Sequence, residues 1–385
     1  MIYLDNNATT RIAPEVAQAM LPWLTERWGN PSSLHRFGDD ALEAVGAARA
    51  SLARLLGARH ASELVFTSGA TEANHLALHQ ARFAPAERRR VITSAVEHAA
   101  VLEPSAALAR EGFAVERAEV APSGALDLDR LLASLDERCA LVSVMWANNE
   151  TGAVHDVAAL GKRCRELEIL FHVDAVQAVG KLPIALREVA IDYLSLSAHK
   201  LHGPKGIGAL WVRRESPFEP LVRGGGQESD RRAGTENVLG IVGLGAAAEL
   251  ARAWLARGGP REVAELRDRL ETRLTERLGP LEVAASSIAR TPNTAQLVLG
   301  DISGEALVLA LSEAGVCASS GSACSSGTHA PSHVLLAMRK TPAEASSSLR
   351  LSLSRYTTEA EVESAAELVA RAVRDLRSLL GASPG

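Results

Sequence analysis

The sequence predicts an α/β protein with a large domain, in which a mainly parallel β-sheet lies between helices, and a smaller α+β domain. Two observations lead to this fold class. Short apolar runs of strand length alternate with longer stretches of helical periodicity over most of the chain, which is typical of parallel strands joined by crossover helices. Nearly all of these runs are apolar on both faces, as expected for strands that helices cover on both sides.

Six apolar runs in the first 240 residues are predicted to form strands of this sheet. Several end in small or polar residues, as in Thr-Ser-Gly-Ala-Thr at 67–71 and His-Val-Asp-Ala at 172–175. Ligands bind at the C-terminal edge of the strands in open α/β sheets, so we expect a functional site at these strand ends. The predicted strands are residues 63–67, 90–94, 140–146, 170–174, 193–197 and 208–212.

The character of the sequence changes after Gly240. The segments that follow predict a smaller α+β domain, so we expect a domain boundary after Gly240. The predicted elements are a helix at 241–278 with an interruption at 258–260, a final amphipathic helix at 358–380, strands at 294–299 and 350–354, and a Ser/Gly-rich loop at about 318–330.

The composition excludes several classes of protein. Of 385 residues, 47% are hydrophobic and 23% are charged, with a net charge of −5, which is typical of a globular chain. This mild acidity offers no basic face for nucleic acid. No apolar run approaches the ~20 residues that span a bilayer, and the start of the chain lacks a signal-peptide pattern. We therefore expect a cytoplasmic protein with no membrane or nucleic-acid partner, whose four cysteines are free thiols.

Lys200 is the candidate for covalent binding of a cofactor. The chain has only five lysines, and this one follows a predicted strand directly, between small residues and glycines that leave room for a planar group. A buried lysine can lose its proton and form a Schiff base, as lysine does with pyridoxal 5'-phosphate (PLP). A lone lysine beside Gly-Pro is more often a solvated loop residue, so the assignment depends on the neighbouring strand ends.

Three residues at neighbouring strand ends match the needs of a PLP ring. Asp174 closes an apolar strand, where a buried carboxylate needs a cation; a protonated pyridine nitrogen would serve, and the carboxylate would keep the ring an electron sink. Gln177 can hydrogen-bond the ring hydroxyl oxygen. His98 also follows a strand, where an imidazole can stack on a flat ring and move protons. The structural alternative for Asp174 is that it caps a following helix.

A phosphate site is expected where Ser-Gly-Ala-Thr at 68–71 stands between a predicted strand and a helix. The backbone N–H groups of this turn, at Ala70 and Thr71, and the Thr71 hydroxyl can hold a phosphate at the helix N-terminus. On its own such a turn is usually only a helix cap. Ser197 and His199 can add a hydroxyl and an imidazole donor from another strand end.

Cys324 is the candidate nucleophile. It lies in a run of small polar residues at 318–327, whereas structural cysteines prefer apolar neighbours and a reactive thiol needs exposure and polar donors. A metal site that joins Cys324 to Cys317, His329 and His333 does not match the short ligand spacing of structural zinc sites. We therefore expect no metal.

Arg350 is the candidate for binding a substrate carboxylate. It alternates with leucines in Leu-Arg-Leu-Ser-Leu at 349–353, so it lies on the opposite face of a strand. A guanidinium held on a strand can bind both oxygens of a carboxylate, and Asn149, in the turn at 148–152, can assist. The alternative for Arg350 is a solvated position on an edge strand.

These segments together resemble the cysteine desulfurases of the NifS/IscS type, which are class V, fold-type-I PLP enzymes. The resemblance covers essentially the whole chain, and its most specific element is Ser-Ser-Gly-Ser-Ala-Cys-Ser at 319–325. It implies a homodimer with both termini in the small domain, so that residues 1–14 join 256–385 and the large domain covers residues 15–255. The other matching segments are residues 3–10, 29–35, 67–74, 96–98, 148–152, 172–177, 197–206, 232–237 and 331–333.

The resemblance also implies a reaction. L-Cysteine would give up its sulfur to Cys324 as a persulfide and leave as L-alanine, and the sulfur would pass to an iron–sulfur scaffold protein or a tRNA-thiolation carrier. The implied roles are PLP attachment and proton transfer for Lys200, ring stacking for His98, ring electronics for Asp174 and Gln177, phosphate binding for Thr71, Ser197, His199 and, from the partner subunit, Thr235, and substrate-carboxylate binding for Asn149 and Arg350.

One segment departs from the family pattern. After Gly-Gly-Gly-Gln-Glu at 224–228, where Arg-Gly is expected, this chain has Ser229 and Asp230. The change puts a negative charge near an expected entrance or docking surface, so the choice of sulfur acceptor stays open. The alternative functions are a selenocysteine lyase or class V aminotransferase and, outside enzymes, a sulfur-carrier or scaffold subunit that turns over poorly.

Overall fold

The computed structural model of the chain describes residues 1–321 and 330–381. Its largest sheet has seven strands in the order β2-β8-β7-β6-β5-β3-β4. All six predicted strands are confirmed within one residue of their expected bounds, while β4 escaped prediction because its sequence, Ala-Val-Glu-Arg-Ala, has no apolar run. The strands are β2 (Leu64–Thr67), β3 (Arg90–Ser94), β4 (Ala114–Ala118), β5 (Cys139–Met145), β6 (Leu170–Asp174), β7 (Tyr193–Ser197) and β8 (Gly208–Val212).

The expectation of a mainly parallel sheet is confirmed. Strands β4, β3, β5, β6 and β7 pair in parallel, whereas β8 runs antiparallel to both β7 and β2. The reason lies in the connection from β7 to β8, which contains only one short 3-10 turn, Ala198–Lys200. A parallel return needs a crossover of about a dozen residues or more, so this shorter connection reverses the strand and holds Lys200 at the end of β7.

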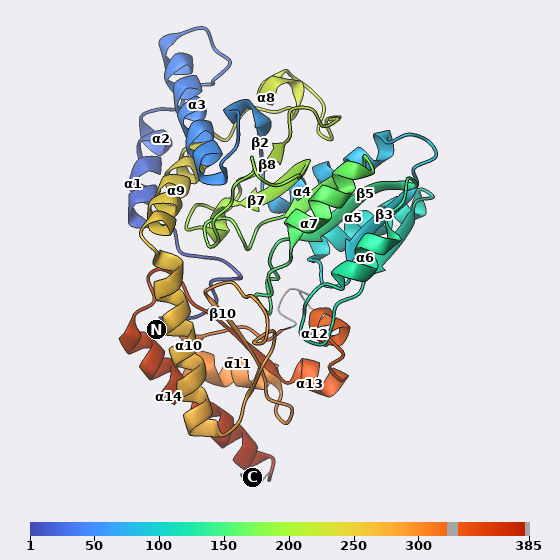
Figure 1. Ribbon diagram of the computed structural model, residues 1–385. Coiled ribbons are helices and arrows are strands. Elements are labelled where there is room, and N and C mark those ends of the chain that lie inside the picture. The colour runs from blue at the N-terminus through green and yellow to red at the C-terminus, as the bar shows by residue number, and fades with distance from the viewer. Residues whose placement is uncertain (322–329, 382–385) are drawn as a thin grey trace.

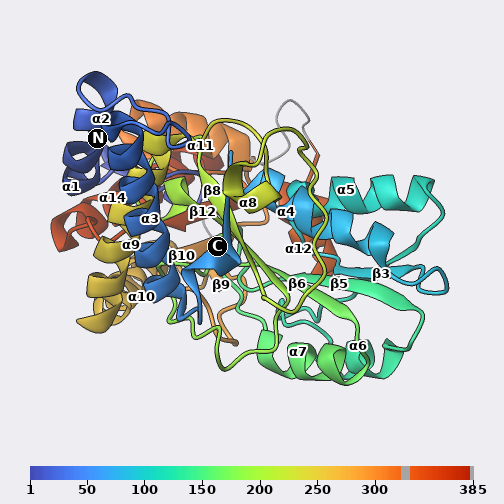
Figure 2. The same ribbon diagram turned by 90° about the horizontal axis from the view of Figure 1, so that it is seen from above.

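Helices cover both faces of this sheet (Figure 2). In that view α4 (Ala70–His79) and α5 (Ala99–Arg110) lie on one side, and α6 (Leu128–Ser134) and α7 (Val157–Glu166) lie on the other. Apart from the edge strand β4, the strands between them are apolar and almost entirely buried, as in β5, where all seven residues are buried. This two-sided burial explains the continuous apolar runs in the sequence.

Helix α9 (Val238–Ala256) corrects one sequence expectation. Within the described part of the chain, it is the one helix long and apolar enough to cross a membrane by length and composition, although no run of that kind was expected. The helix is apolar because it is mostly buried, packed against α3 (Arg36–Leu56) and α1, and a helix buried on most sides reads as hydrophobic all round. Helix α1 covers Pro14–Met20, and α2 (Pro22–Thr25) also contacts α9. The short helix α8 (Gln227–Asp230) precedes α9 in the chain.

The chain beyond α9 builds a three-stranded antiparallel sheet of order β12-β10-β9 and a second hydrophobic core (Figure 1). Strand β12 begins two residues before the prediction because it starts with Ser348, a polar residue that is nevertheless buried. The elements are α10 (Gly259–Leu278), β9 (Glu282–Val283), β10 (Thr294–Val298), α11 (Gly304–Glu313), β11 (Val316–Cys317), α12 (His333–Ala337), α13 (Pro342–Ser346), β12 (Ser348–Ser352) and α14 (Glu359–Leu379).

The N-terminal segment connects the three-stranded sheet to the seven-stranded sheet. Strand β1 (Ile2–Tyr3) pairs in parallel with β11, and Asp5 then forms a bridge with Ser352 of β12. Five residues later the backbone N–H of Thr10 donates to the carbonyl oxygen of His199, at 2.9 Å. The start of the chain therefore crosses from the smaller sheet to the end of β7.

Gly208 in β8 is required by close packing under the turn between β2 and α4. A Cβ atom at this position would lie 2.6 Å from the carbonyl oxygen of Leu196 and 2.7 Å from the backbone of Gly69. Both neighbours are backbone atoms of ordered elements and have little room to move. Gly46 in α3 is the opposite case, since it is exposed and a Cβ atom there would meet no atom within 4 Å.

We predict opposite effects for two glycine-to-alanine changes. Gly208→Ala should destabilise the fold by about 1 to 3 kcal/mol, because the added methyl group overpacks backbone. Gly46→Ala should stabilise the fold by about 0.5 to 1 kcal/mol. At this helical position alanine fits the folded state, and it lowers the conformational entropy of the unfolded chain relative to glycine. Urea unfolding of both variants measures the difference, and equal midpoints would contradict the packing argument.

Candidate active site

A cavity of about 440 Å³ lies at the C-terminal ends of β5, β6 and β7. The N-terminal residues of α4 and the N-cap of α5 also line it, together with residues 7–9 of the N-terminal segment. Pockets at this edge of a mainly parallel sheet are the usual place for ligands. Nine of the predicted site residues line this cavity: Ala70, Thr71, His98, Asn149, Asp174, Gln177, Ser197, His199 and Lys200.

Three predicted site residues do not line it. Cys324 falls outside the residues that the structure describes. Thr235 lines a separate cavity of about 90 Å³, which shares Ser68 and Gly206 with the larger one. Arg350 lies on β12, behind the turn that holds Asn149. The fold therefore brings nine of the twelve candidates together within one chain.

Asp174 presents a buried carboxylate to the cavity. It ends β6, is 5% exposed, and accepts hydrogen bonds from Asn74 Nδ2 at 2.7 Å and from the backbone N–H of Val176 at 3.0 Å. Within residues 1–321 and 330–381 it has no ion pair. The residues after it form turns, so the helix-cap alternative is wrong. Only neutral donors compensate this carboxylate, and a cationic ring nitrogen in the cavity would supply the missing partner.

Helix α4 directs its N-terminus into the same cavity. Its N-cap is Gly69, which has no side chain to accept the first N–H groups of the helix. Ala70 and Thr71 in the first turn line the cavity wall. Backbone N–H groups and the helix dipole at such an end bind phosphate, so this wall suits the anionic part of a ligand.

His98 faces the cavity as a neutral imidazole. It is the N-cap of α5, and its Nδ1 accepts the backbone N–H of Ala100 at 3.0 Å. Because Nδ1 acts as an acceptor, the neutral ring carries its proton on Nε2. Burial lowers the pKa of His98 below its ordinary value; Asp174 opposes this effect and Lys200 adds to it.

Lys200 extends from the 3-10 turn after β7 and meets the N-terminal segment. Its Nζ donates to the carbonyl oxygens of Asn7 at 2.5 Å and Ala8 at 2.7 Å. The neighbouring His199 bonds Thr9 through Nδ1 at 3.1 Å. Burial lowers the pKa of His199 to about 4, with Lys200 adding to the effect, so the imidazole at this wall is neutral.

Sequence reasoning missed the contribution of the N-terminal segment. Asn7, Ala8 and Thr9 line the cavity, and Asn7 is 2% exposed. The one signal in the sequence was the pair Asn6-Asn7, since amides are seldom buried unless they are fully hydrogen-bonded. Nothing in the sequence places this pair beside Lys200, 193 residues away along the chain.

Arg350 is fully buried, so the alternative of a solvated edge-strand arginine is wrong. The residue is 1% exposed on β12; Nη2 pairs with Asp5 Oδ1 at 2.8 Å, and Nη1 donates to the carbonyl oxygen of Asn149 at 3.2 Å. Its Nε has no partner in the part of the chain that the structure describes. The Nε–H is therefore available to a further acceptor beside Asn149.

The chain matches known proteins over nearly its full length. The aminotransferase class-V family model matches residues 2–364. A cysteine desulfurase from Cereibacter sphaeroides is 51% identical over 98% of this chain and 97% of its own. This chain belongs to the NifS-like cysteine desulfurases of the class-V family.

Two solved structures agree with this assignment. A NifS-like protein superimposes on the desulfurase with a TM-score of 0.90 and 36% identity, covering 97% of this chain and 100% of the other. A second structure, described as SspA in complex with cysteine, has a TM-score of 0.81 and 34% identity over 93% of this chain and 100% of its own. These likenesses confirm the predicted fold class.

The family implies PLP as cofactor, and the cavity of this desulfurase fits it. Three features surround one space: a lysine, a buried carboxylate that has no ion pair among the described residues, and a helix N-terminus with no side-chain cap. The lysine can bind the aldehyde of PLP, the carboxylate its pyridine nitrogen, and the helix N-terminus its phosphate. In the described residues no cluster of three His, Cys, Asp or Glu side chains could hold a metal ion.

The described residues on both sides of Cys324 are attached near this cavity. Before it, Ser319 exchanges two backbone hydrogen bonds with Arg350, at 2.7 and 3.2 Å. After it, Ser332 Oγ donates to Glu150 Oε2 at 2.5 Å, and His333 Nε2 bonds the carbonyl oxygen of Glu97 at 2.9 Å. The segment that contains Cys324 therefore starts and ends at residues adjoining Asn149 and His98.

We predict that Glu150→Gln becomes increasingly stabilising as the pH rises. Burial raises the pKa of Glu150 from 4.5 to about 7, so the unfolded state releases this proton first and the free energy of unfolding falls between these two values. Glutamine keeps an acceptor for Ser332 and does not ionise. The variant should gain up to about 3 kcal/mol relative to wild type between pH ~5 and ~8.

Urea unfolding of both proteins across this pH range measures the gain. A difference between Glu150→Gln and wild type that does not change with pH would show that Glu150 ionises in the folded state as it does in water. Glu313→Gln is a matched control, because this carboxyl, at the end of α11, is exposed. It should show no such pH dependence.

Proposed function

We propose that this cysteine desulfurase uses PLP to remove sulfur from L-cysteine, releases L-alanine, and holds the sulfur as a persulfide on Cys324. The observation that carries the proposal is that Lys200 and the ion-pair-free carboxylate of Asp174 line one cavity with the α4 N-terminus. When bound there, PLP would supply an electron sink that weakens bonds at the substrate's carbon atoms. The remaining steps are the work of the chain's own residues.

The residues that would hold the cofactor divide by chemistry. Lys200 would attach it covalently, and Asp174 would bind its ring nitrogen and keep it protonated, because a buried carboxylate favours a cationic partner. Gln177 would hydrogen-bond the ring hydroxyl oxygen, and His98 would contact the ring. Phosphate binding involves Ala70, Thr71, Ser197 and His199, with Thr235 added from the partner subunit.

Proton transfer is assigned to Lys200 and His98. Lys200 would supply an amine in the cavity that takes and returns a proton. His98 holds a proton on Nε2 because its Nδ1 is engaged by Ala100, so the neutral ring offers the cavity a hydrogen-bond donor. Its lowered pKa favours this neutral form, and a proton that the ring takes up would be returned more readily than by a histidine in water.

Arg350 and Asn149 are proposed to bind the substrate carboxylate. The Arg350 guanidinium is desolvated and already oriented by Asp5 and by the Asn149 carbonyl oxygen. Its unpartnered Nε is a donor for a carboxylate oxygen, and a buried, charge-assisted bond of this type is strong. A substrate held here would lie close to the flanking residue Ser319.

Cys324 is proposed to receive the sulfur. Its thiolate attacks the substrate sulfur, so an S–S bond forms as the C–S bond breaks; the electron pair of the C–S bond stays with the substrate carbon, which takes up protons and becomes L-alanine. Among the described cysteines, Cys139 and Cys164 are buried, and burial raises the pKa of each thiol. They are poor candidates, because the thiolate is the nucleophile.

The persulfide is proposed to pass to an acceptor for iron–sulfur cluster assembly or tRNA thiolation. Ser229 and Asp230 bear on this choice, because both are exposed, so a negative charge is available to a partner. Glu228, Ser229 and Asp230 all have left-handed φ values of 50°, 57° and 62°, which is unusual for residues other than glycine. The exposed carboxylate of Asp230 supports an acceptor with a basic contact surface.

We also propose a homodimer and a division into a large domain of residues 15–255 and a small domain of 1–14 and 256–385. Separate hydrophobic cores support the division. An exposed apolar surface on and between α1, α2 and α3 supports the dimer, since patches of this kind mark interfaces. Its residues are Leu21, Leu24, Trp28, Leu34 and Phe37, each between 47% and 103% exposed.

The persulfide proposal predicts a mass change on one residue. Incubation with L-cysteine should add about 32 Da, one sulfur atom, to the peptide that contains Cys324 and should release alanine. Cys324→Ser should keep the visible absorption of bound PLP near ~420 nm but lose the adduct and sulfide release. Lys200→Ala should lose that band. Wild-type sulfide release from the Cys324 variant would refute the mechanism.

The dimer proposal predicts that Trp28→Glu weakens self-association. Trp28 is 74% exposed and contacts Phe37, with ring centroids 5.1 Å apart, so a charge there would have to be desolvated in an interface. We expect at least a tenfold loss in dimer affinity, about 1.4 kcal/mol, in sedimentation analysis. Leu309→Glu, at an exposed position of α11, is the control; a monomeric wild type would refute the dimer.

A further inference from the structure

Lys181 is a second buried lysine beside the active site. It is 8% exposed and lies in the turns that follow β6. Its Nζ donates to Gln177 Oε1 at 2.5 Å and to Asn7 Oδ1 at 3.0 Å. Neither acceptor is charged, and within the described ranges 1–321 and 330–381 no carboxylate pairs with this amine. A buried lysine of this kind is costly to a fold, so it needs an explanation.

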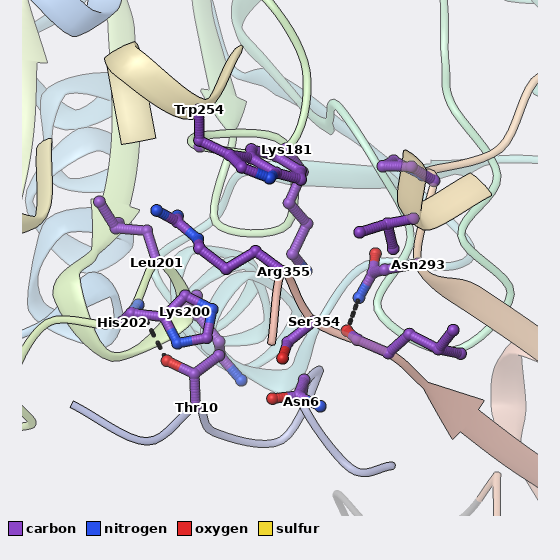
Figure 3. Close-up of a pocket in the computed structure, with 14 residues that line it drawn as sticks. Asn6, Thr10, Lys181, Lys200, Leu201, His202, Trp254, Asn293, Ser354 and Arg355 are labelled. Carbon is purple, nitrogen blue, oxygen red and sulfur yellow. Dashed lines mark hydrogen bonds between the residues drawn. The ribbon is translucent and has the colours of Figure 1, made fainter. Parts of the chain in front are cut away.

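The position of Lys181 argues against direct contact with a ligand in the main cavity. It does not line that cavity. It lines instead a much smaller space of about 30 Å³, shared with Lys200, Asn6 and Asn293 (Figure 3). Such a volume holds about one water molecule. Lys181 therefore lies behind Gln177 and Asn7, whereas these two residues face the main cavity.

The hydrogen bonds of Asn7 fix which of its amide atoms meets Lys181. Asn7 Nδ2 donates to the carbonyl oxygen of Asn149 at 3.0 Å and to Thr294 Oγ1 at 2.8 Å. Its Oδ1 accordingly faces Lys181 and Asn293, and accepts from both at 3.0 Å. The backbone acceptor Asn149 leaves no freedom to reverse this amide.

The amide of Gln177 is oriented in the same way. Its Nε2 donates one hydrogen to the carbonyl oxygen of Asn7 at 3.0 Å, while its Oε1 accepts from Lys181. The one N–H of this amide not used in these bonds is the second hydrogen on Nε2. Gln177 can therefore serve a group in the main cavity as a hydrogen-bond donor.

We infer that Lys181 is a positioning residue that holds the Gln177 amide with its oxygen turned away from the cavity and its N–H available to the cofactor. The inference rests on the proposed function, because the acceptor of that N–H is the ring oxygen of PLP. Lys181 acts on Lys200 as well, since the Asn7 carbonyl that accepts from Gln177 also accepts from Lys200. Burial, with Lys200 and Arg350 nearby, lowers the pKa of Lys181, which reduces the cost of keeping it there.

The test is the pH titration of the visible band of the PLP-loaded protein. An N–H donated to the ring oxygen stabilises the deprotonated chromophore, so its loss should raise the apparent pKa of the band. Lys181→Met removes the donors at nearly constant volume and should raise it by at least ~0.5 unit, in the same direction as Gln177→Leu. PLP should also dissociate at least severalfold faster from the Lys181 variant.

The double variant distinguishes positioning from a direct charge effect. If Lys181 acts through Gln177, the band of Lys181→Met combined with Gln177→Leu should titrate as in Gln177→Leu alone. Additive shifts would overturn the inference, and so would a folded Lys181→Met protein with the wild-type titration. If Lys181→Met does not fold, Lys181→Gln replaces it, because glutamine keeps an amide donor. The band of Lys181→Gln should titrate between wild type and Gln177→Leu. A wild-type titration together with a wild-type PLP dissociation rate would overturn the inference.

Two controls separate this inference from the proposed function. Lys162→Met makes the same chemical change at an exposed position of α7 and should leave the titration unchanged. Wild type and Lys200→Ala test PLP attachment itself. If wild type shows no visible band, the proposed function fails. If the band is present and depends on Lys200 but its titration is unchanged in the Lys181 variants, only the positioning role fails.

Discussion

The complete hydrogen bonding of one buried amide residue, Asn7, is the constraint on which the site depends. Every polar group of Asn7 is used, and its partners come from the three-stranded sheet and from the turns that follow β5, β6 and β7. An amide buried without these partners would cost free energy for each missing bond. The partners are Ser352, Thr294, Asn293, Asn149, Gln177, Lys181 and Lys200. The two hydrophobic cores are thereby held in one relative position at the cavity.

Burial then determines the charge of the groups around the cavity. It lowers the pKa of His98 and raises the pKa of Glu97 to about 8 and of Glu150 to about 7. Asp174 is the buried carboxylate at the cavity wall, and its two described partners are neutral donors. A site with a neutral imidazole and an uncompensated carboxylate suits a cationic ring, and its low dielectric strengthens each remaining interaction.

Much of this arrangement was predictable because strand ends have a fixed relation to a parallel sheet. Asp174, Ser197 and Lys200 follow apolar runs, and parallel strands bring their C-terminal ends to one edge. The direction of β8 was not predictable from its own residues; it follows from the short connection after Lys200. The sequence did not predict the edge strand β4 or the first residues of β12. Strand β4 is exposed and β12 starts with serine, so neither segment shows the apolar pattern of a buried strand.

The sequence by itself determined the fold class, the lysine and carboxylate at adjacent strand ends, and the family, because these depend on local pattern and residue chemistry. The tertiary structure decided what lies against them. It placed Asn7 beside Lys200 and buried Arg350 against Asp5. It also put Lys181 behind Gln177. Such contacts join residues far apart in the chain or on opposite sides of a turn, and the packing of two cores, rather than any local pattern, brings them together.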